Sequence, residues 1–260
     1  MGEALSSKGM GTVFNDLKVL RLNQTGISLT RDCGLGVASL LQAYGARARR
    51  FNRVWLATLL LVVSAAVLAP LPASAQQRLL MLGDSLTAGY GLGAQDALPV
   101  KLQAALTRLG HRVEVLNAGV SGDTTQGGAA RVGWALADRP THAVVALGGN
   151  DGLRGLEPRV TRANLDRILQ QLRTAGVPVL LAGMVAPPNL GREYGEEFNR
   201  LFPELAAQHQ VALYPFILDG VAADPALNQA DGIHPHARGV EVMVQRMLPQ
   251  VLTLLGLQGS

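Results

Sequence analysis

The chain has 260 residues and a formal net charge of +4 at pH 7. Residues 1–75 hold eight Lys or Arg and three Asp or Glu, whereas residues 76–260 hold 15 and 16, so the balances are +5 and −1. The larger part therefore has no excess of positive charge that would indicate nucleic acid or an acidic membrane as a partner. The only cysteine is Cys33, which excludes a disulfide, a thiolate nucleophile and a cysteine metal ligand from residues 76–260.

Residues 47–75 have the pattern of a secretory signal peptide. A basic stretch precedes an uncharged, mostly apolar run of 16 residues at 54–69, and Ala73-Ser74-Ala75 supplies an Ala-x-Ala cleavage site before Gln76. A retained membrane anchor is the alternative, but roughly 20 apolar residues are needed to span a bilayer. We expect export to the periplasm or the medium, without stable membrane insertion after cleavage. Because signal peptides are about 15 to 30 residues long, we interpret residues 1–46 as a non-functional extension.

Residues 76–260 form one predicted domain in which short apolar runs alternate with longer amphipathic segments. This alternation predicts strands that are each followed by a helix, and hence a parallel sheet covered on both faces. The predicted strands are at 78–82, 113–117, 143–147, 179–183 and 211–213. The predicted helices are at 99–109, 126–136, 159–175, 196–209 and 236–255. Right-handed crossovers predict a three-layer α/β/α sandwich with the flavodoxin-like strand order 2-1-3-4-5.

Polar residues that carry chemistry follow several of these strands. In such a sheet, ligands bind beyond the carboxyl ends of the strands. Gly83-Asp84-Ser85 follows the first strand, residues 117–123 leave the second, Gly148-Gly149-Asn150-Asp151 follows the third, and Asp231 and His234 lie after the fifth. These loops are therefore the places where an active site is expected.

Ser85, His234 and Asp231 fit the roles of nucleophile, base and acid. A serine hydroxyl needs an imidazole to accept its proton, and a carboxylate best holds that imidazole by its other nitrogen. The three-residue spacing between Asp231 and His234 lets one turn present both side chains to one cleft. Donors for a developing oxyanion, each worth about 3 kcal/mol, are the backbone N–H groups of Ser85 and Gly122 and the side-chain amide of Asn150.

Together these residues resemble the GDSL or SGNH hydrolases. The blocks are 83–86, Gly122, 148–151 and 231–235, and the stretches 87–91, 150–155 and 215–216 resemble the bacterial arylesterase, acyl-CoA thioesterase I and lysophospholipase subgroup. The resemblance implies the same triad and oxyanion hole, no metal, no cofactor, and hydrolysis of esters and thioesters with medium to long acyl chains. It also implies a mobile substrate-binding loop that senses the acyl chain and consists of Gly152, Leu153, Arg154, Gly155, Leu156 and Glu157.

Each of these residues also has a plainer interpretation. Asp84 or Ser85 could merely cap the next helix, Gly122 could be a turn glycine, and Asn150 could form an Asx-turn. Their occurrence together with the acid and histidine of the last loop favours the catalytic interpretation. Asp84, together with Asp123 and Asp151, is expected to order loops rather than to react.

Three competing sites are disfavoured by spacing. His236 is a second candidate base, but it lies at the start of the last predicted helix. A metal site at Asp231, His234 and His236 would draw all its protein ligands from one loop. The run 89–94 matches a dinucleotide-binding fingerprint, yet it begins seven residues beyond the first strand, and the second strand ends in Asn117 where a ribose-binding acid belongs.

The sequence therefore predicts an exported, monomeric serine hydrolase that acts on small acyl esters, thioesters or lysophospholipids. Two alternatives stay open. The same triad could remove acetyl groups from cell-wall or other carbohydrates, or the cleft could bind acyl chains without turnover. The intact triad counts against the second alternative.

Overall fold

Five parallel strands form the centre of the described chain. The computed structural model describes residue 55 and residues 76–258; the proposed extension at 1–46 and, apart from Trp55, the proposed signal peptide at 47–75 lie outside the described residues. The strands are β1 (Gln77–Gly83), β2 (Val113–Gly119), β3 (His142–Ala146), β4 (Val179–Ala182) and β5 (Ala212–Tyr214). They lie in the order β2-β1-β3-β4-β5, which confirms the predicted topology.

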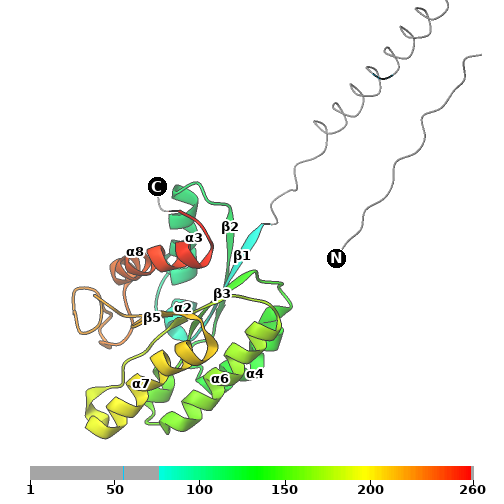
Figure 1. Ribbon diagram of the computed structural model, residues 1–260. Helices are drawn as coiled ribbons and strands as arrows, with labels where there is room; N and C mark the ends of the chain where they lie inside the picture. The colour runs from blue at the N-terminus through cyan, green and yellow to red at the C-terminus, as the bar shows by residue number, and fades with distance from the viewer. Residues whose placement is uncertain (1–54, 56–75, 259–260) are drawn as a thin grey trace, which may run out of the picture. The chain divides into compact units, whose positions relative to one another are not determined.

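Helices cover both faces of this sheet. The long helices are α3 (Leu98–Arg108), α4 (Thr125–Leu136), α6 (Pro158–Thr174), α7 (Arg192–His209) and α8 (Ala237–Leu254). Figure 1 shows α3 and α8 on one side of the strands and α4, α6 and α7 on the other. This arrangement confirms the three-layer sandwich. Because each face is covered, the central strands are apolar throughout, and residues 79–82 of β1 are fully buried.

Two short helices were missed by the sequence analysis. They are α2 (Ser85–Ala88) and α5 (Gly149–Leu153), and the shorter 3₁₀ turns at Ala94–Asp96 and Pro188–Leu190 were missed as well. Elements of one turn are too short to show helical periodicity. The prediction that Ser85 and Asn150 lie in loops is therefore wrong, because Ser85 begins α2 and Asn150 lies within α5. The predicted substrate-binding loop at 152–157 likewise begins inside α5.

The start of α7 was also predicted wrongly. The helix begins at Arg192 and not at Glu196, because Gly191 turns the chain with a φ of 86° before a polar first turn that carries little hydrophobic signal. Apart from this helix, the ends of the long helices and of the strands lie within two residues of their predicted positions.

The sheet register brings the ends of the first three strands level. Gly83 at the end of β1 pairs with Gly119 of β2 and with Ala146 of β3. The segments that leave these strands therefore start from one edge of the sheet, where the candidate site lies. Among the residues that the structure describes, no helix combines the length and apolarity needed to cross a membrane.

Candidate active site

The turn from β1 into α2 presents Ser85 at the carboxyl edge of the sheet. Asp84 caps α2, and its carboxylate accepts a 3.0 Å hydrogen bond from the backbone N–H of Leu86. A Cβ at position 83 would lie 1.9 Å from Thr87 Oγ1, so glycine is required for the close approach of strand and helix. Asp84 thus caps α2, as in the plainer interpretation of this residue, and Ser85 lies in the first turn of that helix.

His234 connects Ser85 to Asp231. The Nε2 atom of His234 lies 2.9 Å from Ser85 Oγ, and the Nδ1 atom lies 2.7 Å from Asp231 Oδ2. With the proton on Nδ1, the ring donates to the carboxylate and Nε2 accepts the serine hydroxyl proton. The serine and the histidine are 149 residues apart in sequence, and the structure brings them together as the sequence predicted.

The turn from Asp231 to His234 is held by the acid itself. Asp231 Oδ1 accepts hydrogen bonds of 2.9 Å from the backbone N–H groups of both His234 and Ile233. Gly232 takes a φ of 71°, which favours glycine in this tight turn. The bonds from the backbone and the ring of His234 lower the pKa of Asp231 to about 2, so the carboxylate is charged at neutral pH.

A buried carboxyl, that of Asp84, lies beside Ser85. Asp84 is 1% exposed, and this burial raises its pKa from 3.8 to about 6, against the opposing effects of the Leu86 hydrogen bond and of His234. Its second oxygen, Oδ2, lies 3.5 Å from Asn150 Nδ2. Asp84 therefore contacts both the nucleophile's helix and one predicted oxyanion donor.

The three predicted oxyanion donors have different surroundings. Asn150 Nδ2 donates a 2.9 Å hydrogen bond to the backbone oxygen of Asp123, and Asn150 and Ser85 line one cavity. Gly122 does not line this cavity; it takes a φ of 79°, and its carbonyl oxygen accepts a 2.8 Å bond from Arg154. The other amide hydrogen of Asn150 points to Asp84 Oδ2 at 3.5 Å, and this long bond is the one that an oxyanion would replace.

The cavity beside Ser85 has a volume of about 140 Å³ and a largely apolar wall. Of the predicted substrate-binding loop, only Leu153 lines it. Arg154 is bound to the Gly122 loop, and the backbone oxygen of Leu156 accepts a 2.8 Å bond from the Tyr194 hydroxyl. The lining residues are Asp84, Ser85, Leu86, Gly149, Asn150, Leu153, Met184, Val185, Pro187, Phe216, Leu218, Ile233 and His234.

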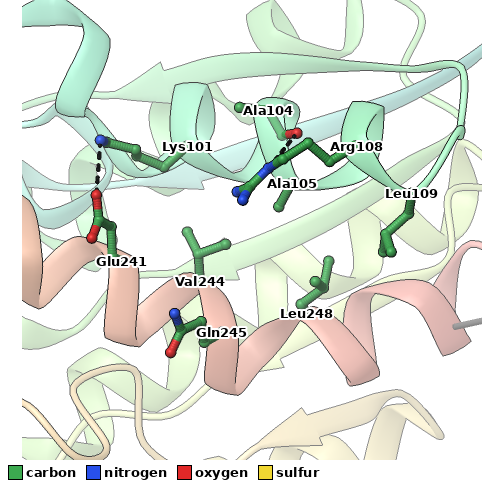
Figure 2. A pocket seen from close by; sticks show the side chains of 9 residues that line it. All are labelled: Lys101, Ala104, Ala105, Arg108, Leu109, Glu241, Val244, Gln245 and Leu248. Carbon is green, nitrogen blue, oxygen red and sulfur yellow. Dashed lines mark hydrogen bonds and ion pairs between the residues drawn. The ribbon is translucent and has the colours of Figure 1, made fainter. Parts of the chain in front are cut away.

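A larger groove of about 580 Å³ is lined by residues of α3 and α8 (Figure 2), and none of Ser85, Asp231 and His234 lines it. Its polar side chains include Lys101, which pairs with Glu241 at 3.2 Å and with Asp96 at 2.9 Å. None of its lining residues is a serine, a cysteine or a histidine. The smaller cavity is therefore the candidate active site, because it alone of the two contains a nucleophile and a base.

His236, one of the three competing sites considered from the sequence, has a structural role. His236 caps α8: its Nδ1 accepts a 3.1 Å bond from the backbone N–H of Arg238, and its Nε2 lies 2.5 Å from the carbonyl oxygen of Ala226. Both ring nitrogens are thus engaged by the backbone. In the described part of the chain, no three His, Cys, Asp or Glu side chains gather in a way that could hold a metal ion.

The profile of the GDSL-like lipase/acylhydrolase family matches residues 81–242. The chain belongs to this family. Esterase TesA of Pseudomonas aeruginosa is 42% identical over 183 residues, which are 70% of this chain and 91% of that protein. Thioesterase 1/protease 1/lysophospholipase L1 of Escherichia coli is 40% identical over 190 residues, 73% of this chain and 90% of that protein.

Solved structures of esterases agree with this assignment. The crystal structure of TesA has a TM-score of 0.66 and 41% identity, and the match covers 68% of this chain and 99% of TesA. The structure of EstA from Pseudoalteromonas sp. has a TM-score of 0.67 and 28% identity, and covers 69% of this chain and 99% of EstA. As a member of the GDSL-like lipase/acylhydrolase family, the chain is a serine carboxylic ester hydrolase.

Tyr90, Thr125 and Thr161 support the site through contacts that the sequence did not predict. The ring of Tyr90 packs against that of His234, with centroids 4.6 Å apart. Asp151 is completely buried and accepts bonds of 2.9 and 2.5 Å from the backbone and hydroxyl of Thr125 and one of 3.2 Å from Thr161. These bonds tie α5 to α4 and α6, so Asp151 orders this segment, which is a helix and not the predicted loop. No sequence signal identified its partners, because they lie on other helices.

Proposed function

We propose that the chain is an exported serine hydrolase that cleaves carboxylic esters and thioesters through an acyl-Ser85 intermediate. The observation that carries this proposal is the unbroken contact from Ser85 Oγ to His234 Nε2 at 2.9 Å and from His234 Nδ1 to Asp231 at 2.7 Å. Each of the three groups is therefore within the distance that proton transfer requires.

The reaction follows from this geometry. His234 accepts the Ser85 proton as the oxygen attacks the acyl carbonyl, and the charged Asp231 stabilises the imidazolium that forms. The oxyanion is bound by the N–H groups of Ser85 and Gly122 and by the Asn150 amide. His234 then protonates the departing alcohol or thiol, and a water molecule activated by the same ring releases the acid from Ser85.

The names of the relatives support esters and thioesters as substrates. The similar proteins are named an esterase, a thioesterase and lysophospholipase, and, in Vibrio mimicus, an arylesterase. A small acyl ester, thioester or lysophospholipid is therefore our proposed substrate. The triad and the oxyanion donors perform this chemistry without a metal or an organic cofactor.

The cavity volume favours a second candidate, the removal of acetyl groups from carbohydrates. An apolar cavity of about 150 Å³ holds a group the size of benzene, and the cavity beside Ser85 is about 140 Å³. A long acyl chain would extend past Leu153 and Val185, which are each 50% exposed, whereas an acetyl group would fit within the cavity. Rates on p-nitrophenyl esters from acetyl to palmitoyl distinguish the two, because preference for acetyl favours the carbohydrate candidate.

The mechanism is tested by covalent labelling. A fluorophosphonate probe should label Ser85 in the wild-type chain, and Ser85→Ala should lose both the label and p-nitrophenyl ester hydrolysis. Ser121→Ala is a suitable control, because Ser121 lies on the same edge of the sheet but outside the cavity. Labelling that persists in Ser85→Ala would refute the mechanism. Saturable acyl binding without turnover would instead favour a binding protein.

Export is proposed from residues 47–75 and is tested separately. N-terminal sequencing of the protein recovered from the periplasm or the medium should begin at Gln76. Recovery of a chain that still carries residues 54–69 would contradict cleavage, and activity confined to the cytoplasm would contradict export. Size-exclusion chromatography of the processed protein tests our proposal that it is a monomer.

A further inference from the structure

Arg131 on α4 reaches three segments that carry the candidate active site. Its Nε donates a 2.7 Å bond to the carboxylate of Asp123, and its two terminal nitrogens donate 2.8 Å bonds to the backbone oxygens of Ala118 and Gly83. The side chain is 24% exposed, and that of Asp123 is 13% exposed. The guanidinium is therefore held against the ends of β1 and β2 by three hydrogen bonds.

Two of these three acceptors lie close in sequence to residues of the proposed machinery. Gly83 precedes the Asp84-Ser85 turn, and its carbonyl oxygen also accepts a 3.1 Å bond from the backbone N–H of Val120. Asp123 follows Gly122, and its own carbonyl oxygen accepts the Asn150 side-chain bond of 2.9 Å. The nucleophile's strand, the Gly122 loop and the Asn150 amide are thus linked through one guanidinium.

Only arginine can make these three bonds at once. Its planar guanidinium points donors in several fixed directions and keeps its charge at any accessible pH, whereas a lysine ammonium donates from a single point. If the guanidinium were removed, the carbonyl oxygens of Ala118 and Gly83 would each lose one donor, and the Asp123 carboxylate would lose its counter-ion. The link between β1 and the Gly122 loop would then rest on the Val120 bond.

We propose that Arg131 is a positioning residue for acyl transfer, which sets the distance between Ser85 and the Gly122 loop without touching the substrate. This inference rests on the proposed function. An oxyanion hole works only when its donors are placed for the oxygen of the transition state. A misplacement of about 1 Å can cost on the order of 100-fold in rate, so the effect should fall on the chemical step and spare the binding of the substrate.

The test compares Arg131→Lys and Arg131→Gln with Arg162→Gln in the full chain. Arg162 is a matched control, since it also pairs with an acid, Glu204, at 2.7 Å, but on the outer surface of α6 and α7. Titration of active sites with a fluorophosphonate counts the folded enzyme, so that kcat refers to active molecules only. We expect kcat to fall about 10- to 100-fold in both Arg131 variants with little change in KM, and no change in the control.

Two further measurements separate positioning from simple loss of fold. The affinity of an alkyl boronic acid, which forms a tetrahedral adduct with serine, should fall in proportion to kcat/KM. Added guanidinium ion should restore part of the kcat of Arg131→Ala and none of any loss in Arg162→Ala. If Arg131→Gln does not fold, the proposal is tested by the same measurements on Arg131→Lys, which keeps the charge.

The inference is overturned if both Arg131 variants keep the wild-type kcat for each titrated site, or if their loss lies wholly in KM. Its failure is distinguishable from failure of the proposed function. A wild-type chain without ester turnover, or an active Ser85→Ala variant, contradicts the proposed function. An active wild type whose Arg131 variants are equally active contradicts the positioning role alone.

Discussion

Replacing Asp84 by asparagine should make the stability of the protein less dependent on pH. Asp84 is 1% exposed, and its pKa is raised from 3.8 to about 6 because burial disfavours the charged form. The native chain thus holds the proton more tightly than the unfolded chain does. The contribution of Asp84 to the free energy of unfolding is largest below pH 3.8 and decreases as the pH rises to about 6.

The magnitude follows from the same two pKa values. The gap between 3.8 and about 6 corresponds to about 3 kcal/mol of lost stability once the carboxyl is ionised in both states. Asparagine keeps the oxygen that caps α2 and is an equally good capping residue. Its amide group would face the Asn150 amide, now 3.5 Å from Asp84 Oδ2, but that cost does not depend on pH.

The assay is urea unfolding of the wild type and Asp84→Asn at pH 4 and pH 7, followed by far-ultraviolet circular dichroism. The stability of the variant relative to the wild type should increase between these pH values by up to about 3 kcal/mol. Comparing the two pH values cancels every cost that does not depend on ionisation. A stability difference that is the same at both pH values, or that moves in the opposite direction, would refute the reasoning.

Four further changes test the site and the core. Asp231→Asn should lower kcat by about 10³-fold or more, because it removes the charge that stabilises the imidazolium; near-normal rates in p-nitrophenyl ester assays would contradict this. Asn150→Ala should lower kcat by about 100-fold or more with little change in KM, and a loss confined to KM would contradict an oxyanion role. Thr125→Val should cost about 1 to 3 kcal/mol in urea unfolding, because Asp151 loses a buried donor. Leu169→Ala should cost about 2 to 5 kcal/mol in the same assay, because Leu169 is 1% exposed; an effect below 1 kcal/mol would mean that the core refills the space.

The proposed catalytic residues were predictable because each lies on a short segment with a strong local signal. Asp231 and His234 are three residues apart, and the turn between them needs no distant partner, since Asp231 accepts bonds from the backbone of its own turn. Ser85 follows a buried apolar strand, and the strand order places its end at the edge where ligands bind. Periodicity and strand-end position were therefore sufficient for the fold and for the placement of the triad.

The supporting residues were not predictable for a physical reason. Arg131 and Thr125 lie in a helix whose sequence shows only ordinary amphipathic spacing, and their roles depend on carbonyl or carboxylate groups from other elements. Tyr90 contacts His234 through a loop that has no periodic pattern. Such contacts are set by the packed tertiary structure, and a single sequence contains no local signal for them.

The wide separation of Ser85 from His234 in the sequence has a consequence for biosynthesis. Translation makes the serine early and the histidine 149 residues later, so the growing polypeptide carries an inert hydroxyl through most of its synthesis. On the proposed mechanism, esterase activity begins only after the segment that carries His234 has emerged and lies against Ser85. A ribosome-bound chain that ends before Asp231 would not hydrolyse acyl esters. The onset of hydrolysis would therefore show that the segment with Asp231 and His234 has been synthesised and has folded.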